Sequence, residues 1–297
     1  MAIFRRPKDG VAAGDAIPFF WDGTYHLFFL TSPLGTTDYP ERVRTSWRHG
    51  ISQNLTDWEE LPIALAPADE PGPDTDGVWT GSVIAADGKF HLFYTGHRLG
   101  ADHPQTICRA VSDDLIRFEK DPNNPLLVPG TETFEPIDWR DPYVFWNEDE
   151  GCYWMLIAAR LNRGPFWRRG CIVLGTSPDL NQWTIDGPLY APYSTYCPEC
   201  PELFQLGSTW YLVYSRFSES AQTLYRLSER PRGPWRVPVR EGLDGRRFYA
   251  AKSLSDGGRR FTFGWVPDRE GETNEGDWEW GGDFAVPREL VPLPSQE

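Results

Sequence analysis

Three acidic residues, far apart in the sequence, are the first candidates for chemistry: Asp15, Asp141 and Glu199. Carboxylates that meet in one pocket repel one another and raise one another's pKa values, unless a cation or a catalytic role accounts for them. Glycoside hydrolysis needs one carboxylate as nucleophile or base and one carboxylic acid as proton donor. A hard cation such as calcium would also bind several such oxygens. No D-x-D-x-D loop occurs, so metal binding ranks second, and neither a metal nor a cofactor is expected.

The neighbours of these acids indicate how two of them are held. Arg140 directly precedes the second acid, and it would keep that carboxylate ionised or donate to a substrate hydroxyl. Pro198 and Pro201 flank Glu199 and exclude a helix, so the segment is predicted to be an irregular loop that leads into an apolar strand. Glu202 is the alternative to Glu199. Because strand faces alternate, one of the two is expected to face the site.

Two sequence patterns recur along the chain and indicate what positions the acids. A short aromatic segment follows a turn signal five times, at intervals of 51 to 65 residues. Its copies are residues 25–29, 90–94, 153–157, 210–214 and 261–265. A second motif, S-x-[DN]-L-x-x-[WF], begins at Ser52, Ser112 and Ser177, with a looser copy at Ser228. This motif predicts a strand end, a tight turn and an aromatic ring that packs back on the next strand.

Repeats of all-β units at this period are typical of propeller blades with four strands each. Five copies therefore predict a five-bladed β-propeller, and the lack of a linker predicts a single domain over residues 1–297. A β-sandwich is the alternative, but it would not repeat one turn motif so regularly. In a propeller the innermost strand of each blade lines a central channel. The three acids precede their aromatic segments by 10 to 12 residues, so they are expected to converge at one mouth of that channel.

The composition of the chain restricts the classes of molecule that it is expected to bind. The formal net charge of −14 disfavours nucleic acids and anionic membrane surfaces, and it is compatible with a neutral saccharide substrate. The 14 Trp, 12 Tyr and 17 Phe are mostly expected in the core, with a minority stacked on sugar rings. The N-terminus has no apolar leader, and no apolar run is long enough for a membrane span. With five cysteines expected to be buried free thiols, these features predict a cytoplasmic protein.

Several short motifs, in order and at their spacing, resemble those of glycoside hydrolase family 32, which comprises five-bladed propeller β-fructosidases. The resemblance runs from about Gly14 to Leu290 and does not include the C-terminal β-sandwich that is usual in the family. The matching motifs are WRHGIS at 47–52, WTGS at 79–82, FYTG at 93–96, WRDP at 139–142, ECP at 199–201, FYAA at 248–251 and PREL at 287–290. Family 43, which shares the propeller, is a more distant comparison.

The resemblance implies a role for each acid. Asp15 would be the nucleophile, Glu199 the general acid and base, and Asp141 the stabiliser of the transition state. Two displacements would release a terminal β-fructofuranosyl residue with retention of configuration. The substrate pocket would be lined by six further residues: Trp47, Trp79, Ser82, Arg140, Tyr249 and Trp280.

The sequence departs from the family at the sugar contacts. The usual Asn before the first acid is replaced by Gly14, the usual Gln at the end of the next strand is replaced by Leu30, and Lys252 stands where Gln is usual. Another furanoside, such as an arabinofuranoside cleaved with inversion as in family 43, is therefore an open alternative. So is a carbohydrate-binding propeller without catalysis. A scaffold for protein partners fits the three acids less well, and a homo-oligomer that covers an exposed blade edge is a further expectation.

Overall fold

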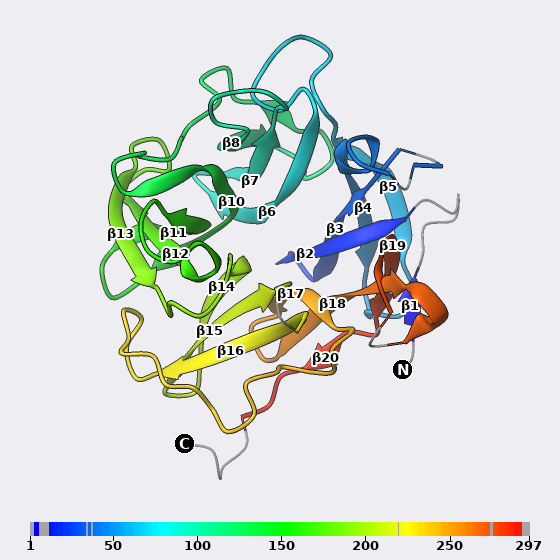
Figure 1. The fold of residues 1–297 in the computed structure, drawn as a ribbon. Coiled ribbons are helices and arrows are strands. Elements are labelled where there is room, and N and C mark those ends of the chain that lie inside the picture. The colour runs from blue at the N-terminus through cyan, green and yellow to red at the C-terminus, as the bar shows by residue number, and fades with distance from the viewer. Residues whose placement is uncertain are drawn as a thin grey trace.

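The computed structural model describes residues 3–5, 12–33, 35–36, 38–218, 220–273 and 276–292. Within these ranges, twenty β-strands form five sheets arranged around a common axis (Figure 1). The predicted all-β fold and the predicted five blades are confirmed: the protein is a five-bladed β-propeller. None of the helices in the described ranges is long and apolar enough to cross a membrane.

The strands follow one another blade by blade. Blade I contains β2 (Ala13–Trp21), β3 (Thr24–Thr31), β4 (Ser46–Ser52) and β5 (Glu59–Leu65). Blade II contains β6 (Gly77–Ala86), β7 (Lys89–His97), β8 (Gln105–Ser112) and β9 (Glu119–Lys120). Blade III contains β10 (Phe134–Asn147), β11 (Cys152–Leu161), β12 (Gly170–Ser177) and β13 (Thr184–Tyr190).

Blade IV contains β14 (Glu199–Leu206), β15 (Thr209–Arg216) and β16 (Gln222–Ser228). Blade V contains β17 (Tyr249–Ser255), β18 (Arg260–Arg269) and β19 (Trp278–Ala285), with β1 (Ile3–Arg5) paired to β19 and β20 (Arg288–Glu289) paired to β18. Among the described residues, three 3-10 helices lie in the connections: η1 (Glu41–Val43), η2 (Phe166–Arg168) and η3 (Glu270–Glu272).

Blade IV differs from the prediction of four strands per blade. Beside β16, the chain from residue 236 to 243 is irregular, although its backbone still bonds to that strand. The amide of Tyr225 donates to the carbonyl of Glu241 at 2.9 Å, and the amide of Leu243 donates to the carbonyl of Thr223 at 2.9 Å. An irregular segment therefore takes the place of the fourth strand.

The predicted aromatic segments occupy the second strand of every blade, namely β3, β7, β11, β15 and β18. Two of these strands follow a two-residue turn with positive φ at both positions: 45° and 75° at Asp22-Gly23, and 51° and 73° at Asp87-Gly88. Such turns match the twist of a hairpin. The apolar residues of these strands pack between neighbouring blades, as with Phe28 and Leu92 between blades I and II. The core thus lies between the blades and holds the ring together.

The second repeated motif forms the predicted tight loops in blades I to III. The leucine of each copy has positive φ: 65° at Leu55, 63° at Leu115 and 62° at Leu180. The indole nitrogen of Trp58 donates to the Leu55 carbonyl at 3.2 Å, and that of Trp183 to the Leu180 carbonyl at 3.1 Å. These loops connect the third strand of each blade to its outer strand.

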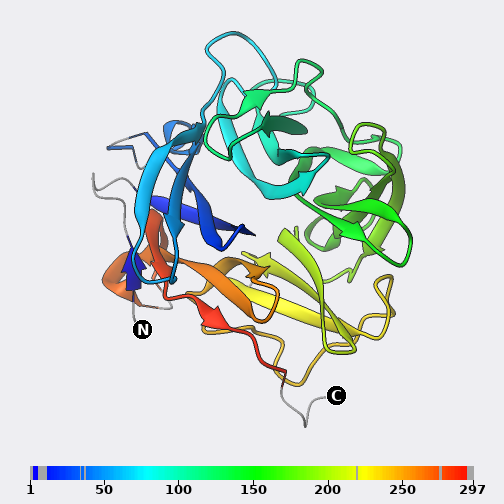
Figure 2. The same cartoon turned by 180° about the vertical axis from the view of Figure 1, so that it is seen from behind.

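The two ends of the described chain meet in one blade. β1 pairs antiparallel with β19, with Ile3 opposite Ala285, so an N-terminal strand completes the sheet formed by the C-terminal strands. Figure 2 shows the dark-blue β1 beside the orange and red strands of blade V. This pairing closes the ring and fixes the inner strand of blade V beside that of blade I.

The inner strands β2, β6, β10, β14 and β17 lie nearest the axis (Figure 1). Each of them breaks register with the second strand of its blade, near the middle of β10 and close to the start of the other four. The breaks fall between residues 14 and 16, 79 and 81, 140 and 143, 199 and 202, and 249 and 252. A bulge of this kind bends a strand and re-aims its side chains, so all five blades present altered backbone at the same level of the propeller.

Candidate active site

A cavity of about 520 Å³ opens at the level of the five bulges. Every inner strand contributes at least one residue to its wall, including Asp15 from β2, Thr80 from β6, Asp141 from β10, Glu199 from β14 and Tyr249 from β17. The structure therefore brings together the three acids that the sequence singled out, from blades I, III and IV. The pocket exists because the strands repeat the same irregularity around one axis.

The bulges also define which residues occupy equivalent positions. Asp15 and Asp141 lie within the register break itself and have positive φ, 38° and 59°. Glu199 lies one residue earlier, at the position of Arg140 in blade III and Tyr249 in blade V. Asp15 and Asp141 thus occupy the same position within their bulges. Glu199 occupies the position before the bulge, as Arg140 and Tyr249 do in their blades.

The Asp15 carboxyl group has a strongly raised pKa. Burial, together with the charges of Asp141 and Glu199, raises its pKa to about 7, while a hydrogen bond with Thr80 and the charge of Lys252 oppose the rise. The thiol of Cys200 lies 3.9 Å from Asp15 Oδ2, at the distance of a weak sulfur hydrogen bond. At neutral pH this carboxyl group is therefore poised between its protonated and ionised forms.

Asp141 is fixed by contacts with the neighbouring blades on both sides. Its backbone amide donates to Oγ1 of Thr95 in blade II at 2.8 Å. Its Oδ2 accepts the amide of Cys200 in blade IV at 2.8 Å, and Nε of Arg140 lies 3.8 Å from the same oxygen. The side chain is almost fully buried. One orientation of this carboxylate is therefore selected before any ligand enters.

Both oxygens of Glu199 have a donor. Nη2 of Arg140 donates to Oε1 at 3.0 Å, and the hydroxyl of Tyr249 donates to Oε2. Burial raises the pKa of Glu199 and Asp141 adds to the rise, while the bonds to Arg140 and Tyr249 limit it. The side chain keeps 22% of its accessible surface, so it still faces the cavity. A carboxyl group with a raised pKa at a pocket wall is suited to proton transfer.

Arg140 connects the acids to two residues that sequence reasoning missed. Its Nη1 donates to Gln105 Oε1 at 3.0 Å and to Asp138 Oδ1 at 2.5 Å, and all three residues line the cavity. Asp138 stands beside the WRDP motif, so its position in the sequence was a usable signal. Gln105 comes from β8, outside every motif, and nothing in its sequence context marks it.

The other predicted pocket residues divide into three groups. Trp79 lines the cavity and stacks on His97 with ring centroids 4.1 Å apart. Trp47 and Ser82 do not line it: Trp47 is fully buried and donates to the Trp79 carbonyl at 2.9 Å, whereas Ser82 donates to the Pro142 carbonyl at 2.9 Å. Both support the strands behind the pocket. The side chain of Trp280 lies outside the described residues, although its backbone belongs to β19.

Glu202 lies at a different level of the channel from Glu199. Its carboxylate accepts the amide of Ser253 at 2.9 Å and the Ser253 hydroxyl at 2.7 Å, and Arg260 lies 3.5 Å away. Ser253 and Arg260 line a second cavity of about 460 Å³, formed farther along the same inner strands. Lys252 is buried between the two levels and donates to the Gly81 carbonyl at 2.5 Å.

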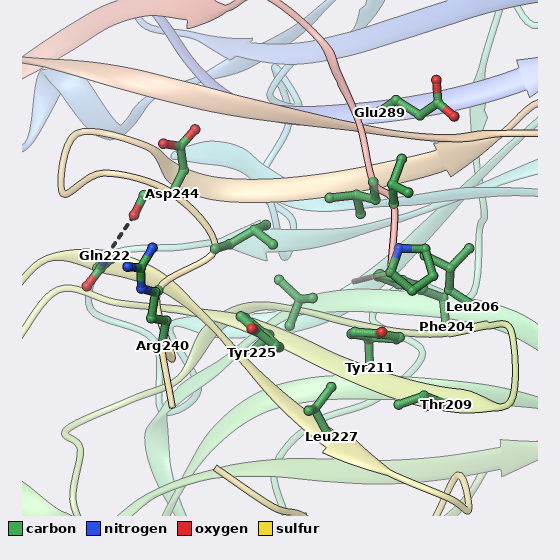
Figure 3. Close-up of a pocket in the computed structure, with 16 residues that line it drawn as sticks. Phe204, Leu206, Thr209, Tyr211, Gln222, Tyr225, Leu227, Arg240, Asp244 and Glu289 are labelled. Carbon is green, nitrogen blue, oxygen red and sulfur yellow. Dashed lines mark hydrogen bonds between the residues drawn. The ribbon is translucent and has the colours of Figure 1, made fainter. Parts of the chain in front are cut away.

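A third cavity, of about 660 Å³, lies away from the three acids. It lies between blade IV and the chain around residues 289–292, and Figure 3 shows Tyr211 and Tyr225 on its wall. The dashed line in Figure 3 is the bond from Gln222 to the Asp244 carbonyl, 2.7 Å long. This cavity shares no lining residue with the pocket of the three acids.

Across the described part of the chain, no three His, Cys, Asp or Glu side chains form a group that could hold a metal ion. The five cysteines are free thiols, four of them buried. Cys197 and Cys200 lie close to the acids but form no disulfide.

Comparison with known proteins places these features in a family. Residues 7–295 match the glycosyl hydrolases family 32 N-terminal domain. The sucrose-6-phosphate hydrolase of Bacillus subtilis is 32% identical over 300 residues, which cover 92% of this chain and 58% of that protein. The raffinose invertase of Escherichia coli is 31% identical over 292 residues, with 91% and 58% covered. The chain therefore spans a little over half the length of these curated relatives.

Solved structures agree in fold. A Bombyx mori β-fructofuranosidase of family 32 superposes with a TM-score of 0.76 at 25% identity, covering 95% of this chain and 61% of that one. Fructan 1-exohydrolase IIa of Cichorium intybus superposes with a TM-score of 0.78 at 23% identity, covering 99% and 58%. The match over nearly the whole sequence and the shared propeller show that this chain belongs to glycoside hydrolase family 32.

Proposed function

We propose that this protein is a glycosidase that releases a terminal β-fructofuranosyl residue with retention of configuration. The observation that carries the proposal is the meeting of Asp15, Asp141 and Glu199 in one cavity. The family match and the names of the relatives, which include a sucrose-6-phosphate hydrolase and a raffinose invertase, support this class of substrate. We also propose that residues 1–297 act as one domain, because β1 and β19 close a single ring.

In the first step, the ionised Asp15 attacks the anomeric carbon of the fructosyl unit. A bond forms between a carboxylate oxygen and that carbon, and the bond from the carbon to the leaving oxygen breaks. Glu199 transfers its proton to that oxygen, so the leaving group departs as a neutral alcohol. In the second step, Glu199 accepts a proton from water, the water oxygen bonds to the anomeric carbon, and Asp15 is released.

The two proposed roles are electrostatically coupled. The charge of Glu199 is one of the causes that raise the pKa of Asp15, so a proton retained on Glu199 favours ionisation of Asp15. Protonated Glu199 and ionised Asp15 are the states that the first step requires. Such coupled carboxyl groups titrate as a set, with one proton more easily kept than two.

Asp141 is proposed to stabilise the transition state through hydroxyl groups of the sugar. Its carboxylate is held by the Cys200 amide and approached by Arg140, so it is oriented without help from a ligand. A preoriented acceptor of this kind strengthens its bonds as positive charge develops on the sugar ring.

A second substrate class is favoured by one feature of the pocket. Leu30 lines the cavity where the family usually has a polar side chain, and Gly14, beside Asp15, has no side chain. Both changes remove hydrogen-bonding groups from the wall that would hold the terminal sugar. An arabinofuranoside, which has fewer hydroxyl groups to satisfy, is therefore the second candidate.

The test is a panel of sucrose, raffinose, inulin, levan and an aryl α-L-arabinofuranoside. We expect fructose release from at least one fructoside, and a fall in kcat/KM of about 10²- to 10⁴-fold for Glu199→Gln. Glu132→Gln, which alters an exposed acid in blade III, serves as the control and should retain wild-type activity. Equal rates for wild type and Glu199→Gln would disprove the role of Glu199, and turnover of the arabinofuranoside alone would favour the second class.

A further inference from the structure

Four aromatic residues form a continuous group beside the pocket, which we call the aromatic platform: Phe166, Trp167, Tyr196 and Phe217. The ring centroids of Phe166 and Trp167 are 5.1 Å apart, and those of Trp167 and Tyr196 are 5.4 Å apart. Tyr196 and Phe217 follow at 5.5 Å. Phe217 itself lines the cavity of the three acids, so the platform continues the wall of that cavity outward.

The platform is anchored by a buried cation. The guanidinium of Arg160 lies 3.7 Å from the ring centroid of Tyr196 and 4.7 Å from that of Phe166, within the range of a cation–π contact. Its Nη1 donates to the Tyr196 carbonyl at 2.8 Å, and its Nη2 to the Phe166 carbonyl at 2.9 Å. Arg160 is fully buried and bonds to Glu135 at 2.6 Å. The backbone that carries these rings is therefore fixed in place.

The same anchor reaches the charged network of the pocket. Nε of Arg160 lies 3.4 Å from Asp138 Oδ2, and the Tyr196 hydroxyl donates to that oxygen at 3.4 Å. Asp138 also accepts from Arg140, which binds Glu199. Asp138 and Arg140 thus link the aromatic platform to Glu199, the proposed proton donor.

Most of the platform faces solvent. Trp167 is 63% exposed, Phe166 50% and Phe217 38%. The helix η2, which carries the first two rings, has no buried residue, so core packing does not account for them. Rigid, exposed aromatic faces next to a polar pocket are suited to stacking on the C–H faces of sugar rings.

The position of the platform indicates which part of a substrate would reach it. Glu199 is proposed to protonate the leaving oxygen, so the leaving group must extend from the Glu199 side of the cavity. Tyr196 precedes Glu199 by three residues, and Phe217 follows β15, the strand that pairs with β14. Asp15 and Leu30, which would meet the terminal sugar, come from blade I instead.

We propose that the aromatic platform binds the leaving-group sugars of an oligosaccharide, beyond the unit that is attached to the scissile bond. The inference rests on the proposed function. The substrates then include chains of three or more sugars, such as short fructans, and these chains lie across blades III and IV. The disaccharide sucrose would leave Trp167 uncovered.

The test compares sucrose with the tetrasaccharide nystose in wild type, Trp167→Ala and Trp146→Ala. Trp146 is an exposed indole on the same blade that lines the cavity farther along the channel, so it is a matched control. We expect Trp167→Ala to lower kcat/KM for nystose about three- to tenfold and to leave that for sucrose within about twofold. The Trp146 variant should keep the wild-type ratio. Equal losses on both saccharides, or none, would overturn the proposal.

A binding measurement separates this proposal from the proposed function. Calorimetry with nystose on Glu199→Gln, with and without Trp167→Ala, needs no turnover. A weaker Kd in the double variant supports the platform even if no fructoside is hydrolysed, and equal Kd values overturn it. Sedimentation of wild type and Trp167→Ala adds a third outcome: a change of oligomeric state with an unchanged nystose-to-sucrose ratio would assign the platform to contacts between copies of the chain and contradict sugar binding.

Discussion

The blade III–IV side of the pocket and the blade I side hold their carboxyl groups in different ways. On the first side, Glu199 accepts from Arg140 and Tyr249, and Asp141 accepts a backbone amide. On the second side, Asp15 is aimed by a backbone bulge and flanked by the apolar Leu30. The proposed proton donor is thus held by two side chains, whereas the proposed nucleophile stands beside an apolar side chain on the wall that would meet the terminal sugar. We therefore expect changes on the two sides to have separable effects on catalysis and on sugar preference.

The largest effect should come from the acid of blade I. Asp15→Asn removes the proposed nucleophile, and we expect kcat to fall by about 10⁴-fold or more, as found when a covalent nucleophile is lost. Asp113→Asn, which alters an exposed acid of blade II, should keep wild-type rates. Steady-state kinetics on the best fructoside of the panel measures both. A loss of less than tenfold in Asp15→Asn would show that the blade I side does not carry the nucleophile.

A smaller effect should come from restoring polarity on the same side. Leu30→Gln places an amide where the family usually has one, at a position that is almost fully buried beside the cavity. If the substrate is a fructoside, the new hydrogen bond should lower KM by about three- to tenfold, because one such bond contributes about 1 kcal/mol. Leu30→Met, which changes shape but not polarity, is the control. An equal change in both variants would mean that polarity at this wall is irrelevant.

The smallest expected effect comes from replacing Lys252, the buried cation between the two levels of the channel. Lys252 lowers the pKa of Asp15, so Lys252→Gln should raise that pKa above its present value of about 7. The nucleophile acts in its ionised form, so the acidic limb of the pH profile of kcat/KM should move to higher pH, by about half a unit to one unit. Lys89→Gln, at an exposed pair with Asp113, should leave the limb in place. A shift towards lower pH would contradict the assignment of that limb to Asp15.

The sequence repeats were sufficient to predict the blades but not the fine geometry of the site. Five aromatic segments mark five second strands because β-strands between blades must bury aromatic and branched side chains. The bulges have no comparable signature. Similar spacing therefore predicted that the three acids converge, but not that Glu199 aligns with Arg140 and Asp15 with Asp141.

The same bulges explain the residues that were misplaced or missed. Alternation of strand faces predicted that one of Glu199 and Glu202 faces the site, and Glu199 lines the cavity; the register break between them places Glu202 farther along the channel. A motif match does not distinguish a residue that lines a pocket from one that supports it, which is why Trp47 and Ser82 were expected in the wall. Gln105 reaches Arg140 through the packing of blade II on blade III. The two residues are 35 positions apart in the sequence, so no local sequence pattern predicts their contact.

The most direct test of the account is the stereochemistry of transfer to methanol. An enzyme that forms a fructosyl ester on Asp15 and then passes the sugar to methanol yields methyl β-D-fructofuranoside, which NMR distinguishes from its anomer. We predict the β-anomer from wild type and no methyl fructoside from Asp15→Asn. The methyl α-anomer, or transfer that persists in Asp15→Asn, would contradict the double displacement at the centre of the account.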